Sequence, residues 1–136
     1  MDKLEKAINK YYFNRLINGD KVYYQIVEDK VYLSDSYSIS IIDKTDFKLD
    51  LNYFTEVNLN SFIESIRDFK YYDVKDYKQN INRSYTLYSD NLQVLIDKKY
   101  MKLYENLKIQ ITEPIKPILF LQNDIIRGFI LPIKEY

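Results

Sequence analysis

The chain has 136 residues, enough for one compact domain with a buried core. Its 20 Lys and Arg residues balance its 20 Asp and Glu residues, so contact with nucleic acid or anionic membrane would need a local patch of charge. Cysteine and histidine are absent, which excludes disulfides, Cys/His zinc sites and catalysis by either residue. No stretch approaches ~18 uninterrupted apolar residues, and the N-terminus lacks an apolar core of signal-peptide length. We therefore expect a cytoplasmic protein that does not contact membranes.

The first segment, residues 2–17, predicts an amphipathic helix. Asp2 and Glu5 are spaced as a capping box, and Asn18 with Gly19 forms a stop signal. The apolar positions recur at helical spacing and comprise Leu4, Ala7, Ile8, Tyr11 and Tyr12.

Residues 22–42 predict a three-stranded antiparallel meander. Tyrosine and β-branched residues alternate through this region, as they do in half-buried strands. Glu28–Asp29 forms the first predicted turn, and residues 34–36 (Ser-Asp-Ser) form the second. The same Ser-Asp-Ser segment has no histidine anywhere in the chain to complete a catalytic triad.

The middle of the chain gives a weaker pattern. Residues 44–54 predict a loop and a short strand, and residues 71–90 predict two strands around a polar loop at 79–84. Between them a second helix is expected, with Asn58 or Asn60 as its cap. Its apolar stripe consists of Leu59, Phe62, Ile63, Ile66 and Phe69.

The last third returns to a clear pattern. A strand at 92–96 leads into a short helix capped by Asp97, whose inward side chains are Tyr100, Met101 and Tyr104. An alternating strand at 107–111 follows, and then two apolar runs joined by a turn at Asn123–Asp124. Because an isolated hairpin is only marginally stable in water, we expect these runs to be central strands covered by helices.

Residues 2–42 and 97–133 share one predicted order, a helix followed by three short strands. This repeat of element order predicts an α+β fold, with an antiparallel sheet and two to three helices packed on one face. We expect a single domain over residues 1–136.

Residues 92–133 resemble the carboxy-terminal part of bacterial DNA-polymerase sliding clamps. Those proteins end with a strand, a short helix carrying a Tyr-Leu-like pair, an alternating strand, a Pro-X-hydrophobic strand and a closing strand with an apolar-Pro-apolar triplet. The matching segments here are 94–96, 99–101, 108–111, 117–120 and 130–133. Looser matches lie at 32–42 and 55–69. The chain has room for about one clamp domain, whereas a bacterial clamp subunit carries three.

The resemblance implies a noncatalytic protein of clamp-like fold that contacts DNA with its helices and assembles into a closed oligomer. It also implies a pocket for partner peptides at the terminal strand, bordered here by Pro132 and Ile133, with Tyr136 beyond them. The lysines on the helices that would face DNA are Lys3, Lys6, Lys10, Lys98, Lys99 and Lys102. Their attraction to phosphate would be independent of sequence and steeply dependent on salt. A solvated helix face with acids interspersed is the alternative interpretation of these lysines.

Other polar and aromatic residues leave further alternatives open. The 15 tyrosines are either base-stacking platforms or ordinary sheet residues, and adjacent pairs such as Tyr71–Tyr72 must place one ring on the surface. Asp43, Asp46 and Asp50 form either a site for a hard cation or a polar loop without the glycine and final glutamate of an EF-hand. A two-carboxylate hydrolase is the catalytic alternative, but we expect no enzyme, no metal and no cofactor.

Two functions follow from these observations. The first is a noncatalytic, macromolecule-binding protein encoded by a phage or mobile element, with a clamp-like domain associated with DNA replication or DNA-bound machinery and possible homo-oligomerisation. The second is a protein-binding inhibitor or adaptor that blocks a host or defence factor without DNA affinity, in the manner of anti-CRISPR proteins. The neutral net charge favours the second function and the clamp resemblance favours the first.

Overall fold

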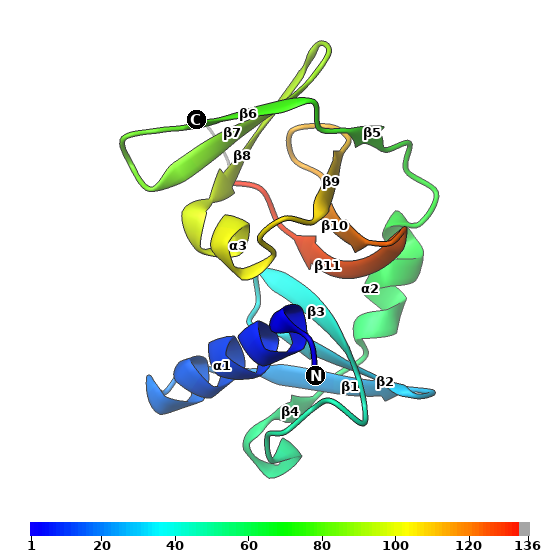
Figure 1. Cartoon of the computed structure of the whole chain (residues 1–136). Helices are drawn as coiled ribbons and strands as arrows, with labels where there is room; N and C mark the ends of the chain where they lie inside the picture. Colours follow the sequence, from blue (N-terminus) through cyan, green and yellow to red (C-terminus); the bar gives the residue numbers. More distant parts are fainter. Residues whose placement is uncertain (134–136) are drawn as a thin grey trace. The chain divides into compact units, whose positions relative to one another are not determined.

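The computed structural model describes residues 1–133 of the chain (Figure 1). Within them lie three α-helices, one short 3-10 helix and eleven strands, so the predicted α+β class is confirmed. None of the helices in the described part is long and apolar enough to cross a membrane. The chain divides into two compact units, residues 1–67 (unit 1) and residues 68–136 (unit 2), and each is described by itself. The expected single domain over residues 1–136 stays a prediction.

Unit 1 consists of the predicted helix and meander, followed by a loop and a second helix. In the sheet, β1, β2 and β3 pair antiparallel in sequence order, and β4 adds parallel to β1. The elements are α1 (Lys3–Ile17), β1 (Tyr23–Val27), β2 (Lys30–Ser34), β3 (Ser38–Asp43), the 3-10 helix η1 (Leu51–Tyr53), β4 (Thr55–Glu56) and α2 (Leu59–Ile66).

The helix starts of unit 1 lie where their caps predict. Asp2 accepts a hydrogen bond from the Glu5 backbone N–H at 3.0 Å, while the Glu5 carboxylate accepts one from the Asp2 N–H at 2.8 Å. This reciprocal capping box satisfies two backbone donors that a helix start leaves without partners. Asn58 caps α2 with a single hydrogen bond, accepted by its side chain from the Ser61 N–H at 3.0 Å.

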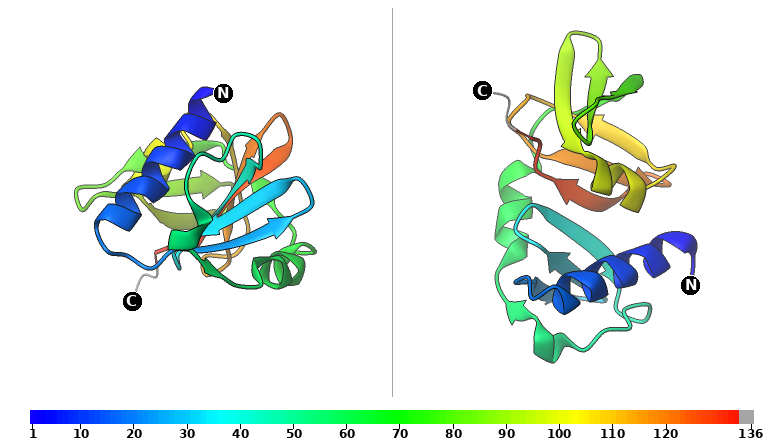
Figure 2. Two further views of the ribbon diagram at one scale, coloured as in Figure 1. Left: turned by 90° about the horizontal axis from the view of Figure 1, so that it is seen from below. Right: turned by 90° about the vertical axis from the view of Figure 1, so that its left-hand side faces the viewer.

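The two helices of unit 1 contact opposite faces of its sheet (Figure 2), which differs from the predicted packing on one face. The Tyr12 hydroxyl of α1 donates to the Leu33 carbonyl oxygen at 3.0 Å, on the face that carries the buried side chain of Val31. The N–H of Asn60 in α2 donates to the Gln25 side chain at 2.7 Å, on the other face. The meander has apolar side chains on both faces, so each face needs a cover.

Part of the predicted α2 stripe is exposed. Leu59, Ile63 and Ile66 are buried, but Phe62 is 39% exposed. The helix ends at Ile66, before Phe69. The apolar stripe of α2 is therefore narrower than the sequence spacing indicates.

Unit 2 contains the sheet strands β11-β10-β9-β5, which are hydrogen-bonded in that order, a three-stranded sheet in the order β6-β7-β8, and one helix beside β7 and β8 (Figure 1). The strand pairs in both sheets are antiparallel. The elements are β5 (Tyr72–Asp73), β6 (Asp76–Gln79), β7 (Ser84–Ser89), β8 (Leu92–Asp97), α3 (Lys98–Leu103), β9 (Lys108–Ile111), β10 (Ile118–Gln122) and β11 (Ile125–Ile130).

The repeated element order is confirmed, because α1-β1-β2-β3 and α3-β9-β10-β11 are both a helix followed by an antiparallel meander. The turn at Asn123–Asp124 is confirmed too, with φ values of 51° and 65° that suit a two-residue hairpin of the I′ type. Asp97 caps α3 through the Lys99 N–H at 2.9 Å, as expected.

The apolar ribbon that ends the sequence forms the centre of its sheet. Residues 118–121 of β10 are all buried, between β9 and β11. Tyr104, the C-cap of α3, is 1% exposed and stacks on Phe120, with ring centroids 4.8 Å apart. The predicted cover of this ribbon by a helix is therefore confirmed at α3.

Gly128 makes room for this tyrosine ring. A Cβ at position 128 would lie 2.5 Å from Cζ of Tyr104 and 2.8 Å from its Cε1 and hydroxyl oxygen. The β10–β11 register shifts beside this point, so that Arg127 is the extra residue of a bulge. A glycine inside a strand commonly marks such a close approach of another part of the chain.

We expect Gly128→Ala to lower the free energy of unfolding by about 1–3 kcal/mol, because the added methyl group overlaps the Tyr104 ring. Urea denaturation checks this value. In a Tyr104→Leu background, which lacks the overlapping ring atoms, the same change should cost less. An equal cost in both backgrounds would contradict the steric account.

Candidate functional site

A cavity of about 450 Å³ opens beside α3 in unit 2. Its lining comes from β6, β7, β9, β10 and α3, together with the loop that follows α3. Volumes of this order are typical of sites for small molecules or for single groups of a larger ligand. The lining of this cavity contains both aromatic rings and two of the predicted DNA-facing lysines. We take the cavity as the candidate functional site and call it the aromatic cavity.

One wall of the aromatic cavity carries Tyr77 of β6 and Tyr85 of β7. In the β6–β7 hairpin Tyr77 pairs with Leu87 and Gln79 pairs with Tyr85, so both tyrosines lie on the same face of the small sheet. Their ring centroids are 5.8 Å apart with an interplanar angle of 66°, an edge-to-face contact. Tyr77 is 58% exposed, which leaves much of its ring available to a ligand.

The stacked pair of Tyr104 and Phe120 also lines the aromatic cavity, together with Met101. Both stacked rings are almost fully buried, so this part of the lining is rigid. The chain reverses after α3 at Asn106, whose φ of 68° is a left-handed conformation that asparagine tolerates. Asn106 is itself one of the polar residues in the lining.

The predicted DNA-facing lysines fall in two places, one in each unit. Lys98 and Lys102 of α3 line the aromatic cavity, whereas the Lys99 amine lies over the Tyr100 ring, 5.0 Å from its centroid. Lys3, Lys6 and Lys10 lie on α1 in unit 1. All six side chains are exposed, and within residues 1–133 neither Lys98 nor Lys102 forms an ion pair.

The predicted partner-binding residues lie after the last strand. Pro132 is half-buried and Ile133 is 39% exposed, and the Ile133 N–H donates to the Leu95 carbonyl oxygen at 2.8 Å. This bridge adds Ile133 to the outer edge of β8. Tyr136, the third predicted residue, lies outside the described residues.

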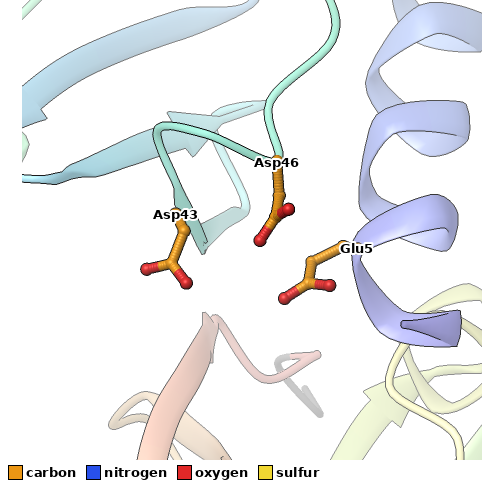
Figure 3. Close-up of side chains that lie close together, drawn as sticks. All are labelled: Glu5, Asp43 and Asp46. Atoms are coloured by element: carbon orange, nitrogen blue, oxygen red, sulfur yellow. The ribbon is translucent and has the colours of Figure 1, made fainter. Parts of the chain in front are cut away.

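Of the three residues of the predicted cation site, the structure brings two together and places the third elsewhere. Asp43 and Asp46 come together with Glu5 of α1, their carboxylate oxygens within 4.8 Å of one another (Figure 3). Asp50 instead caps η1, through the Asn52 N–H at 2.9 Å. Sequence spacing missed Glu5, because its approach to the loop depends on how α1 packs.

Contacts within the fold account for this acidic cluster. Asn9 holds the loop against α1, donating to the Asp46 carbonyl oxygen at 3.0 Å and accepting from the Lys48 N–H at 2.9 Å. Lys30 forms an ion pair with Asp43. The Glu5 carboxylate is already bound to the Asp2 N–H. The cluster is therefore assigned a structural role.

Sequence reasoning also missed the two tyrosines of the aromatic cavity. It placed their strands but gave no means of bringing residues 77 and 85 to the lysines of α3. One signal was present, since Tyr85, Leu87 and Ser89 share one face of a predicted strand that leads, through a second strand, directly into α3. The stacking of Tyr104 on Phe120 left no comparable signal.

The surroundings of Glu5 give a pH-dependent prediction. Burial is the main cause that raises the pKa of Glu5 above its ordinary value of 4.5, and the side chains of Asp2 and Asp46 raise the pKa further. The folded protein then binds more protons than the unfolded chain between the two pKa values, so the contribution of Glu5 to stability falls as pH rises through that interval. Glu5→Gln should therefore be more stable than the parent at pH 7, and this difference should shrink as pH falls toward 4.5.

Urea denaturation between pH 4 and 7 measures this difference. Glu113→Gln, at an exposed position, is the matched control and should show no such trend. A Glu5→Gln variant that is less stable than the parent at pH 7 would contradict the assignment.

Comparison with known proteins gave no match to a family model, a curated protein or a solved structure.

Proposed function

We propose that this chain is a noncatalytic, macromolecule-binding protein with a clamp-like domain, encoded by a phage or mobile element, that associates with DNA or DNA-bound machinery. Its helices would contact the phosphate backbone, and several copies would assemble to enclose the DNA. Cytoplasmic localisation is part of the same proposal.

The repeated element order supports the clamp-like part of the proposal. The clamp resemblance implies helix-then-three-strand units, and α1-β1-β2-β3 and α3-β9-β10-β11 follow that order. The matching segments noted in the sequence fall on β8, α3, β9, β10 and the end of β11.

The observation that carries DNA association is the exposed lysine face at the start of α1. Lys3, Lys6 and Lys10 are spaced i, i+3 and i+7, which places them on one side of the helix. Glu5 is buried and its carboxylate lies with those of Asp43 and Asp46 (Figure 3). Glu5 therefore does not lie among these lysines, whereas the exposed Asp2 precedes Lys3, and the three lysines together offer positive charge to phosphate.

A second candidate function, the protein-binding inhibitor or adaptor, is favoured by the segment after β11. Leu131 and Ile133 are each 39% exposed on either side of Pro132. Exposed apolar side chains beside a sheet edge are suited to a protein partner. This function requires no DNA affinity.

DNA association predicts a salt-dependent affinity that depends on the α1 lysines. Fluorescence anisotropy with a labelled duplex should give an affinity that falls steeply between about 50 mM and about 200 mM salt. The triple variant Lys3→Gln/Lys6→Gln/Lys10→Gln should weaken binding and reduce the slope of log K against log salt by about 0.9 for each phosphate that is no longer neutralised. The variant Lys21→Gln/Lys44→Gln/Lys48→Gln removes the same charge from exposed positions elsewhere in unit 1 and should change the slope less.

Light scattering on a size-exclusion column measures the oligomeric state of the same protein and so tests the proposed assembly. A closed oligomer agrees with the clamp-like proposal, whereas a monomer without DNA affinity at low salt would refute it. In that case the inhibitor function can be tested by a pull-down from host lysate. The parent chain should retain a host protein, and the variant Leu131→Ser/Ile133→Ser should not retain it.

A further inference from the structure

The aromatic cavity has the size and the lining for one flat aromatic group. Its volume of about 450 Å³ exceeds that of a single nucleobase, and four of its lining residues are aromatic. Tyr77 and Tyr85 approach it from the β6–β7 hairpin, while Tyr104 and Phe120 form a stacked pair deeper in the fold. Every base has a flat π face, so rings in this arrangement can stack on it without reading its sequence.

Positive charge lies beside these rings. Lys98 and Lys102 are four residues apart on α3, so they share one side of the helix, and both are exposed. Nucleic acid has a phosphate on each side of every internal base, and a base in the cavity would bring these phosphates to the two amines. The lysines therefore give the cavity a preference for a polyanion over a neutral aromatic group.

A polar group and an acid complete the lining. Asn106 is one of the lining residues, and an asparagine carboxamide carries both a donor and an acceptor for a base edge. The base-pairing edge is free for such contact only when the base is unpaired, because a duplex keeps its bases stacked inside. Glu105 adds one negative charge to the lining.

We infer that the aromatic cavity takes an unpaired base of a single-stranded nucleic acid, with the flanking phosphates on Lys98 and Lys102. This inference rests on the proposed association with nucleic acid and assigns the single-stranded form to unit 2. The exposed Tyr77 and the half-buried Tyr85 supply the stacking surface. Contact with phosphate in this cavity is separate from the lysine face of α1 in unit 1.

The test compares a single-stranded oligonucleotide of about 12 nucleotides with a duplex of the same sequence, by fluorescence anisotropy. We expect Tyr77→Leu/Tyr85→Leu to weaken single-strand binding roughly 5- to 150-fold, because stacking contributes about 1–3 kcal/mol per base, and to leave duplex binding unchanged. Lys98→Gln/Lys102→Gln should reduce the single-strand salt slope by about 0.7 for each phosphate that is no longer neutralised. The matched control is Tyr37→Leu/Tyr53→Leu, which removes two exposed tyrosines from unit 1 and should bind as the parent does.

Cross-linking gives a second measurement that does not depend on affinity. An oligonucleotide with 5-bromouracil should cross-link on irradiation to peptides that contain Tyr77 or Tyr85, and thermal melts show which variants remain folded.

The outcomes separate the two proposals. If the parent chain binds duplex DNA and Tyr77→Leu/Tyr85→Leu loses no single-strand affinity, this inference is overturned and the proposed function is left intact. Single-strand binding that depends on these tyrosines, without duplex binding, would support the inference and refute enclosure of duplex DNA. Absence of binding to both forms would refute both proposals.

Discussion

The packing of Tyr104 against Phe120 and Gly128 is the contact on which the arrangement of unit 2 depends. The ring stacks on one neighbour and occupies the space that a side chain at position 128 would fill. Because Tyr104 is the C-cap of α3, this contact fixes the end of the helix against the sheet formed by β9, β10 and β11. Lys98 and Lys102, one turn apart on the same short helix, are thereby held at the mouth of the aromatic cavity. A six-residue helix has little stability of its own, so its position has to come from such packing.

In unit 1 a buried tyrosine also attaches the helix to the sheet, but through different contacts. Tyr12 of α1 is fully buried, and its hydroxyl group lies 3.0 Å from the Leu33 carbonyl oxygen and 3.3 Å from Ser40 Oγ. A small residue of the meander, Ser40 in unit 1 and Gly128 in unit 2, faces the tyrosine in each case. In unit 1 the tyrosine forms hydrogen bonds and also contacts the Phe54 ring, whereas in unit 2 it stacks on Phe120. The shared order of a helix and three strands is therefore accompanied by a buried tyrosine at the helix in both units, although the residues that contact this tyrosine differ.

The elements that sequence predicted are those governed by local signals. Asp2, Asn58 and Asp97 cap the three helices as expected, and Asn123–Asp124 adopts the positive φ values of its turn. What sequence could not supply depends on contacts far apart in the chain. The exposure of Phe62 reflects how α2 lies on its sheet, and Glu5 meets Asp46 through the loop that Asn9 holds. The aromatic cavity combines a hairpin, a helix and a loop, so its lysines could be predicted from the sequence while its rings could not.

The positions of the lysines make the proposed affinity for phosphate compatible with a neutral chain. Several acids are engaged inside the fold: Asp35 is 2% exposed and accepts hydrogen bonds from Ser38 and Tyr11, Glu5 is buried, and Asp97 caps α3. The six lysines proposed to face DNA are all exposed. Lysines grouped on α1 and α3 can create local positive surface in a chain without net charge, but the field of such a surface is screened beyond about 8–10 Å at physiological salt. Long-range steering would then add little to association, and nucleic acid would be held chiefly after contact. With so short-range an attraction, binding affinity would increase most if the protein also contacted the base. The tyrosines of the aromatic cavity would supply that contact by stacking.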